Sequence, residues 1–218
     1  MASRLFAVLP VKPFEEGKTR LAGLLNLRGR VALNRQLLDC TLDRLAQYPG
    51  SDHTVVVSRS DDVLRLARQR GCHTVQELPP YGLNAAVLWG VCKAREAEAD
   101  AVVVMPVDLP QGSGEDLRRL VESAPAGPVC VLVPDHHGQG TNLLFQAPVQ
   151  LDHYEFGPDS LSRHRQLAAR AGLLPVVRDD SVFAFDIDEP ADYLRWRPRG
   201  AALGVAGAAC AAAALQPI

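Results

Sequence analysis

Residues Leu5–Leu21 read LFAVLPVKPFEEGKTRL, and the fold class follows from this stretch. Its apolar start, Leu5–Leu9, is too short for a helix and is typical of a buried strand that ends at Pro10. A charged loop comes next, and open α/β sheets bind their ligands in loops that leave the carboxyl ends of strands. The stretch therefore predicts an α/β fold with a ligand site after its first strand.

Three cations lie in that loop: Lys12, Lys18 and Arg20. Fixed positive charges at the end of a strand favour a polyphosphate ligand, because lysine and arginine are the usual phosphate-binding side chains. Gly17-Lys18-Thr19 matches the end of a P-loop motif, but that motif requires a glycine where Lys12 stands and is therefore excluded. A solvated surface loop is the alternative at this point.

Strand and helix patterns alternate through the first half of the chain. The expected helices are Arg30–Tyr48, Asp61–Arg70 and Leu83–Glu98, and the expected strands are Thr54–Val57, His73–Gln76 and Ala101–Met105. Such alternation joins parallel strands by right-handed crossovers and leaves helices on both faces of the sheet. We therefore expect a single α/β domain with a mainly parallel central sheet.

The second half departs from this alternation. After a helix at Glu115–Ser123, strands are expected at Val129–Val133 and Thr141–Phe145, with only a polar turn between them. Strands joined without a helix indicate an antiparallel insertion or edge pairing, and such strands can also pair across a homodimer. The remaining expected elements are a helix from Ser160 to about Ala171, strands at Leu174–Val177 and Val182–Phe185, and a short helix toward Trp196.

The length, the net charge and the distribution of cysteines limit the class of protein. No linker divides the 218 residues, so we expect residues 1–198 to form one domain and the Ala/Gly-rich residues 199–218 to form a loose or disordered tail. A net charge of −2 argues against a nucleic-acid partner, and the tail is too weakly apolar for a bilayer helix. Five scattered cysteines without a CxxC pair, and an N-terminus without a signal-peptide pattern, indicate a cytoplasmic protein with reduced thiols.

Asp108 lies just beyond the expected strand Ala101–Met105, at the same sheet edge as the Lys18 loop. A carboxylate beside polyphosphate normally holds Mg²⁺, which prefers oxygen ligands. The alternative is an aspartate turn before Pro110.

Asp186 and Asp188 form a second acidic candidate, after the expected strand Val182–Phe185. At most one of the two is expected to face the site. Capping of a helix that begins near Pro190 is the alternative role.

The lysine loop, the Asp108-Leu109-Pro110 stretch and the closing Asp-x-Asp-x-Pro of Asp186–Pro190 resemble the nucleotidyltransferases of the glycosyltransferase-A-like, or nucleotide-diphospho-sugar transferase, fold. More narrowly, Leu5 to Trp196 resemble the 2-phospho-L-lactate guanylyltransferase family, including its phosphoenolpyruvate and 3-phosphoglycerate variants. The motifs that carry this resemblance are Val11–Phe14, Gly17–Leu21, Gly140–Asn142, Phe156–Ser160 and Arg163-His164.

The resemblance implies transfer of GMP from GTP to a phosphorylated three-carbon acid, with release of pyrophosphate, in the biosynthesis of a deazaflavin redox coenzyme. It implies catalytic roles for Lys18, Asp108 and Asp188, with Mg²⁺ on Asp108 and Asp188 and with Asp186 as the alternate ligand. The nucleotide contacts that it implies are Pro10, Lys12, Lys18, Arg20 and Asn84, and the acceptor contacts are Thr141, Asn142, Gly157 and Ser160. Helix capping is the alternative role of both Asn84 and Ser160.

Departures from the family pattern leave the acceptor open between phosphoenolpyruvate, 2-phospho-L-lactate and 3-phosphoglycerate. The run His136–Gln139 replaces small and acidic residues, and adjacent loop histidines are usually solvated, so a direct role for His137 is the less favoured reading. The run Leu143–Phe145 is bulkier than the family pattern and can reshape the acid pocket.

Two rival functions belong to different classes. One is a molybdopterin cytidylyl- or guanylyltransferase of the same fold, which leaves Phe156–Ser160 unexplained. The other is a non-catalytic nucleotide-sensing module, against which the intact Lys18, Asp108 and Asp188 argue.

Overall fold

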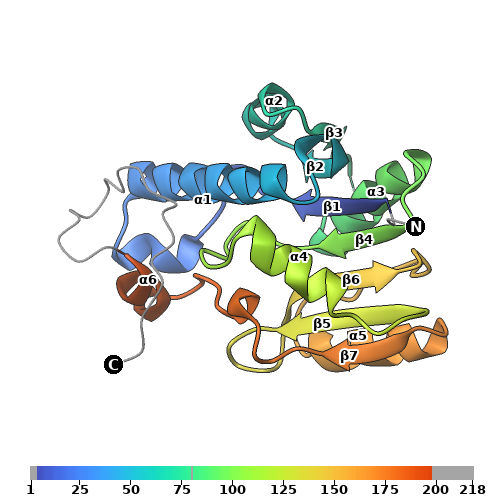
Figure 1. Ribbon diagram of the computed structural model, residues 1–218. Coiled ribbons are helices and arrows are strands. Elements are labelled where there is room, and N and C mark those ends of the chain that lie inside the picture. Colours follow the sequence, from blue (N-terminus) through green and yellow to red (C-terminus); the bar gives the residue numbers. More distant parts are fainter. Residues whose placement is uncertain (1–3, 80, 198–218) are drawn as a thin grey trace.

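One seven-stranded sheet organises the computed structural model, which describes residues 4–79 and 81–197 (Figure 1). From edge to edge its strands are β3 (His73–Gln76), β2 (Thr54–Ser58), β1 (Leu5–Pro10), β4 (Ala101–Val104), β6 (Thr141–Ala147), β5 (Val129–Pro134) and β7 (Leu174–Val177). Neighbouring strands are parallel except at β6, which is antiparallel to both β4 and β5. The predicted α/β sheet with an antiparallel insertion is confirmed.

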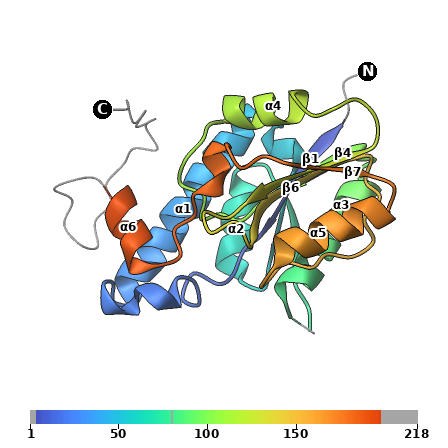
Figure 2. The same cartoon turned by 90° about the horizontal axis from the view of Figure 1, so that it is seen from below.

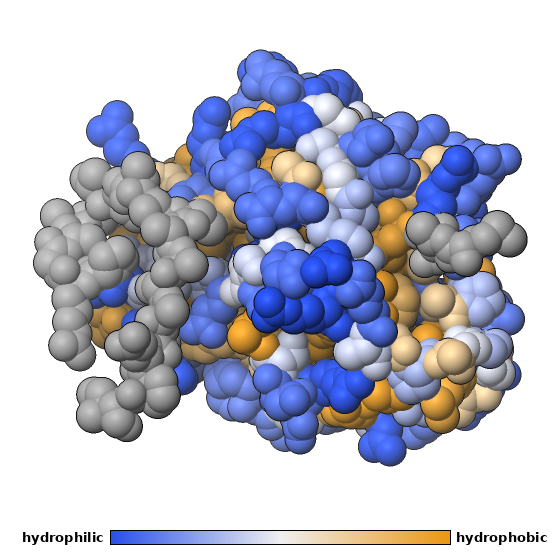
Figure 3. Space-filling view, in the orientation of Figure 1, coloured by the Kyte–Doolittle hydropathy of each residue, from blue (hydrophilic) through white to orange (hydrophobic). Residues whose placement is uncertain are grey.

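Helices cover both faces of the sheet, as Figure 2 shows. The helices of one face are α1 (Leu27–Gln47), α2 (Asp61–Gln69) and α4 (Gly114–Glu122), and those of the other are α3 (Leu83–Glu96) and α5 (Ser160–Arg170). Helix α3 lies very close to the sheet at Gly90, where an added Cβ would come within 2.4 Å of a Val8 methyl group. Outside the core, α4 presents charged side chains to solvent (Figure 3), where Arg118 pairs with Glu115 and Glu122.

The apolar run at residues 182–185 is not a strand, so that expectation was wrong. It contains the 3-10 helix η3 (Val182–Ala184), where the Phe183 N–H donates to Ser181 Oγ at 3.2 Å. Phe183 is fully buried in the core beneath α1 and α4. The run is apolar because its two aromatic side chains are buried, Phe183 in this core and Phe185 in a separate apolar cluster, and strand pairing plays no part in their burial.

A third apolar cluster lies beyond the end of the sheet. It joins the 3-10 helix η1 (Thr19–Gly23) and the start of α1 to the segment that leads into α6 (Pro190–Trp196). Leu21, Leu37, Ile187 and Tyr193 are among its buried members. This cluster therefore brings the lysine loop beside the segment that carries Asp186 and Asp188.

Neither antiparallel strand is available for pairing across a dimer, because β5 and β6 are both flanked by strands of their own sheet. That route to a homodimer is therefore wrong, while the homodimer itself stays a prediction. Within residues 4–79 and 81–197, no helix has the length and apolar character needed to cross a bilayer. The tail expected at residues 199–218 lies outside the described residues.

Candidate active site at the carboxyl edge of the sheet

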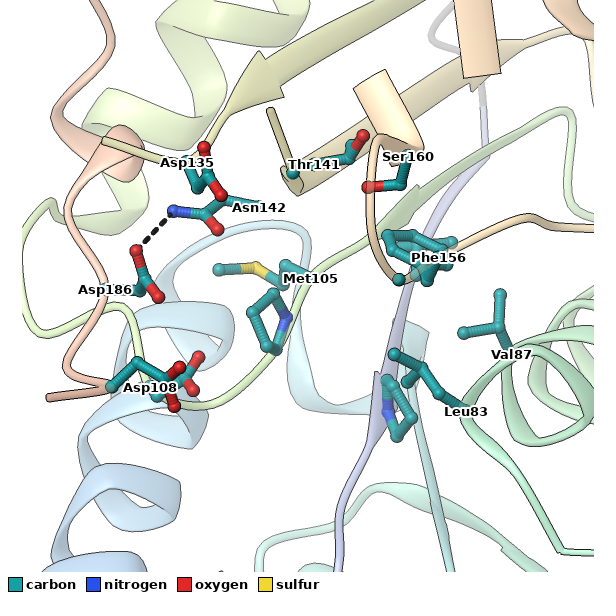
Figure 4. A pocket seen from close by; sticks show the side chains of 16 residues that line it. Leu83, Val87, Met105, Asp108, Asp135, Thr141, Asn142, Phe156, Ser160 and Asp186 are labelled. Carbon is teal, nitrogen blue, oxygen red and sulfur yellow. Dashed lines mark hydrogen bonds between the residues drawn. The ribbon is translucent and has the colours of Figure 1, made fainter. Parts of the chain in front are cut away.

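A cavity of about 320 Å³ opens where β1 and β4 end and where the antiparallel strand β6 begins. It is lined by Pro10, Leu83, Val87, Val104, Met105, Pro106, Asp108, Asp135, Gly140, Thr141, Asn142, Phe156, Gly157, Ser160, Asp186 and Asp188. Figure 4 shows the carboxylates of Asp108 and Asp186 on one side of this cavity and the side chains of Thr141 and Ser160 on the other. The carboxyl edge of the sheet, which topology predicts as the ligand site, therefore contains a cavity with an acidic side and a hydroxyl-bearing side.

Lys18 reaches the acidic side, where its Nζ lies 2.5 Å from Asp108 Oδ2. The ammonium end is well covered, since the Lys18 side chain is only 8% exposed and that of Asp108 is 24% exposed. Lys18 has a left-handed backbone with a φ of 55°, which costs energy in a residue other than glycine. Helix α1 holds the loop in place, because Asn34 Nδ2 donates to the Phe14 carbonyl at 2.7 Å and Arg30 Nη1 donates to the Gly17 carbonyl at 3.1 Å.

The Asp108 loop is fixed by the same helix. Arg44 is buried on α1 and donates to the Gly112 and Leu109 carbonyls, each at 2.9 Å. The Ile187 N–H donates to the Asp108 carbonyl at 3.1 Å. The two acidic segments are therefore joined directly through the backbone.

Asp186 and Asp188 both line the cavity, so the expectation that at most one would face the site was wrong. The reason is that side chains alternate along an extended segment with a period of two, so residues 186 and 188 point to the same side. Arg20 forms an ion pair with Asp188. His136 Nδ1 lies 3.1 Å from Asp186 Oδ1, while His137 packs on the His136 ring.

Asp186 is electrostatically destabilised as a carboxylate. Burial raises its pKa, and the nearby negative charge of Asp108 raises it further, against hydrogen bonds from His136 and Asn142 that lower it. Asn142 Nδ2 lies 3.3 Å from Asp186 Oδ1 and also donates to the Phe183 and Ala184 carbonyls (Figure 4). Asn142 was expected to contact the acceptor, and in the structure its amide nitrogen holds the acidic segment.

The donor set of this acidic side suits a hard divalent cation. Carboxylate oxygens of Asp108, Asp186 and Asp188 line one cavity, and the raised pKa of Asp186 indicates negative charge that a cation would relieve. In the part of the chain that the structure describes, no three acidic, histidine or cysteine side chains form a closed metal cage. Mg²⁺ does not require one, because it usually takes one or two carboxylates and completes its shell with water and phosphate oxygens.

The opposite side of the cavity is built by the start of α5. Ser160 is 1% exposed and is the first residue of that helix, while Asp159 occupies the N-cap position. The capping role considered for Ser160 is therefore wrong. Gly157 has a φ of +131°, a conformation that glycine adopts without steric cost. Helix N-termini attract anions, so Ser160 and Gly157 lie where an acceptor phosphate is expected.

Asn84 does not cap α3, whose N-cap residue is Gly82. Its side chain instead clamps the loop before α5, since Asn84 Oδ1 accepts the Phe156 N–H at 2.7 Å and Nδ2 donates to the Phe156 carbonyl at 3.2 Å. Among the expected nucleotide contacts, Pro10 lines the cavity and Lys12 is exposed on the lysine loop. Nucleotide contact stays a prediction for all five residues: Pro10, Lys12, Lys18, Arg20 and Asn84.

Several cavity residues were not identified from the sequence. Asp135 lines the acidic side, Leu83, Val87 and Phe156 form an apolar wall on the other side, and Met105 lies between the two (Figure 4). A signal for Asp135 existed, because it directly follows strand β5 and begins a turn with two histidines. The apolar residues carried no such signal, because core residues have the same composition.

Comparison with known proteins agrees with this geometry. A family model described as "Guanylyl transferase CofC like" matches residues 5–197. The phosphoenolpyruvate guanylyltransferase of Rubrobacter xylanophilus is 36% identical over 196 residues, which cover 90% of this chain and 95% of that protein. The 2-phospho-L-lactate guanylyltransferase of Methanobrevibacter smithii is 28% identical over 190 residues, which cover 86% of this chain and 81% of that protein.

The fold has solved counterparts. A nucleotidyl transferase from Methanothermobacter thermautotroptrophicus superposes with a TM-score of 0.61 at 18% identity, covering 89% of this chain and 96% of that one. The family match spans all of the residues that line the cavity. The chain is therefore a nucleotidyltransferase that belongs to the CofC-like guanylyl transferase family.

Proposed function

We propose that this protein transfers a guanylyl group from GTP to a phosphorylated three-carbon acid, releases pyrophosphate, and so supplies the biosynthesis of a deazaflavin redox coenzyme. The observation that carries the proposal is the two-sided cavity, with Asp108 and Asp186 facing Thr141 and Ser160. A nucleotide with its cation fits the acidic side, and a small anion fits the side at the helix N-terminus. Family membership and the names of the relatives support the same reaction.

The chain's own residues position two anions and neutralise their charge. An oxygen of the acid's phosphate attacks the α-phosphorus of GTP, and the bond from that phosphorus to the leaving pyrophosphate breaks. The acceptor phosphate is already ionised near neutral pH, so no general base is required. Lys18 neutralises the triphosphate and the leaving group, with Lys12 and Arg20 in support, while Ser160 orients the acceptor.

Asp108 and Asp188 would hold Mg²⁺, with Asp186 as the alternate ligand. When bound, the ion withdraws charge from phosphate oxygens and so favours transfer. The carboxylate donor set and the raised pKa of Asp186 support this assignment. In the structure, the Lys18 ammonium is the counter-ion of Asp108, with Nζ 2.5 Å from Oδ2.

Phosphoenolpyruvate is the acceptor that we favour. Relatives at 36%, 36% and 34% identity carry the name phosphoenolpyruvate guanylyltransferase. The apolar wall of Leu83, Val87 and Phe156 also suits the methylene group of phosphoenolpyruvate better than the free hydroxyl of 3-phosphoglycerate. A buried hydroxyl without a partner costs about 1–3 kcal/mol.

The test uses purified protein with GTP, Mg²⁺ and one acid at a time, and it follows pyrophosphate release. Phosphoenolpyruvate is expected to react fastest, then 2-phospho-L-lactate, with 3-phosphoglycerate and a molybdopterin acceptor as comparison arms. Release with the pterin alone, or with none of the acids in a coupled assay that traps an unstable product, contradicts the proposal. A cytoplasmic location is part of the proposal and is supported by the scattered cysteines, of which Cys72, Cys92 and Cys130 are thiols.

A further inference from the structure

A buried histidine lies directly behind the acceptor side of the cavity. His164, one turn after Ser160 on α5, has no exposed surface and uses both ring nitrogens. Its Nε2 lies 3.1 Å from the backbone nitrogen of Glu155, and its Nδ1 lies 3.0 Å from Thr141 Oγ1. The ring therefore connects the loop before α5 to the first residue of β6.

The contact with Glu155 determines the tautomer of this ring. A backbone N–H can only donate, so His164 Nε2 must carry a lone pair and accept. Burial lowers the pKa of His164 to about 4, with the charge of Arg163 adding to the effect, so the ring is neutral near pH 7. In a neutral imidazole whose Nε2 is bare, the proton lies on Nδ1.

That tautomer in turn determines what Thr141 can do. Nδ1–H donates to Thr141 Oγ1, and a hydroxyl that accepts this bond keeps its own proton for another acceptor. Within residues 4–79 and 81–197, Thr141 Oγ1 has no second hydrogen-bond partner. Thr141 lines the cavity opposite the carboxylates, on the same side as Ser160 (Figure 4).

We propose that His164 is a positioning residue that keeps the Thr141 hydroxyl as a hydrogen-bond donor to the acceptor acid. The inference rests on the proposed function and adds a specific chain of bonds to it: Glu155 N–H to His164 Nε2, His164 Nδ1–H to Thr141 Oγ1, and Thr141 Oγ1–H to an anionic oxygen of the acid. In the other tautomer, Nδ1 would carry no proton and would accept the hydrogen bond from the Thr141 hydroxyl. The anionic acid would then face only the lone pairs of Thr141 Oγ1, which cannot donate a hydrogen bond to it.

Two amide variants separate this role from simple support of the loop. The side-chain amide of asparagine reaches about as far as Nδ1 of histidine, so His164→Asn can still donate to Thr141 but offers no acceptor to the Glu155 N–H. The side-chain amide of glutamine reaches about as far as Nε2, so His164→Gln can accept from the Glu155 N–H but offers no donor to Thr141.

We expect His164→Gln to raise the KM for the acid about 3- to 10-fold, as for loss of one neutral hydrogen bond that orients the Thr141 hydroxyl, while the KM for GTP changes less than about twofold. His164→Asn should keep the acid KM within about twofold of the wild type. The opposite order of the two variants would show that His164 only supports the loop and would overturn the proposal.

A double-variant experiment with Thr141→Val is the second test. If His164 acts through the Thr141 hydroxyl, His164→Gln should add little to the acid KM of Thr141→Val, whereas full additivity overturns the proposal. Nitrogen-15 NMR of the wild-type imidazole needs no variant and no turnover: a proton on Nδ1 is expected, and a proton on Nε2 refutes the chain of bonds. The NMR result stands even if wild-type protein fails to turn over GTP with any acid, so failure of the proposed function is distinguishable from failure of this inference.

Discussion

Replacement of Lys18 by methionine tests the charge balance of the acidic side most directly. Methionine keeps most of the buried stem and removes the ammonium, so Asp108 loses a partner at 2.5 Å and remains near Asp186. Exposed ion pairs contribute about 0.2–1 kcal/mol, and breaking a fully buried pair costs about 3–5 kcal/mol. With side chains 8% and 24% exposed, this pair lies nearer the buried limit, so we expect a loss of about 2–3 kcal/mol in the free energy of unfolding.

For a chain of this length, that loss corresponds to a fall in Tm of about 4–12 °C. Thermal unfolding is measured once with a chelator and once with excess Mg²⁺. Because the cation can replace the missing ammonium on Asp108, Mg²⁺ should raise the Tm of Lys18→Met more than that of the wild type. Turnover with GTP should fall about 100-fold, equivalent to about 2.7 kcal/mol of barrier.

The matched control is Lys12→Met, which removes an exposed charge from the same loop. Its Tm should stay within about 1 °C of the wild type in both conditions. The reasoning is refuted if the two variants lose the same Tm, or if Mg²⁺ stabilises Lys18→Met no more than the wild type.

Four further results are expected. Asp108→Asn should keep the fold but reduce turnover at limiting Mg²⁺ at least ~100-fold in initial-rate assays, and near-normal rates would remove Asp108 from the site. Asp186→Asn should raise the Tm measured in chelator, because a buried carboxylate destabilised by Asp108 is gone, while turnover falls; a lower Tm would contradict this. Ser160→Ala should raise the KM for the acid about 10-fold or more and leave the KM for GTP unchanged in saturation curves; an unchanged acid KM would exclude the contact. For His164, the pKa is about 4 in the folded protein and about 6.5 when unfolded, so its neutral ring stabilises fully above pH 6.5 and this contribution is lost as pH falls toward 4. The loss is on the order of 3 kcal/mol, and urea unfolding of His164→Gln across that range should lack it.

The elements that bury continuous apolar runs could be predicted from the sequence. Strand β4, which is fully buried, ends within one residue of its expected boundary, and the partly exposed edge strands at His73–Gln76 and Leu174–Val177 also have the expected bounds. Asp108 could be assigned to the site for a topological reason, because β1 and β4 are parallel and both end at the same edge. In these cases the local pattern and the overall fold agree.

Contacts between distant parts of the chain could not be predicted in this way. Asn34 and Arg44 lie on the buried side of α1, where a search for apolar periodicity passes over polar residues, yet they hold both loops of the acidic side. The pairing of Lys18 with Asp108 joins residues 90 positions apart, and no local spacing encodes it. Phenylalanine is common in strands, so Phe183 was assigned to one. It enters the core because a space between α1, α4 and the sheet accommodates its ring.

The reversed direction of β6 has a consequence for how substrate preference can evolve. It allows one continuous stretch, residues 129–177, to contribute strands, the loop before α5 and α5 itself as the acceptor wall. The candidate nucleotide residues all precede residue 85, and the candidate acceptor residues all follow residue 140. Changes in acid preference can therefore accumulate mainly in this segment, to which α3 adds only the apolar residues Leu83 and Val87, and recombination of this stretch would exchange most of the acceptor-binding residues between relatives as a unit.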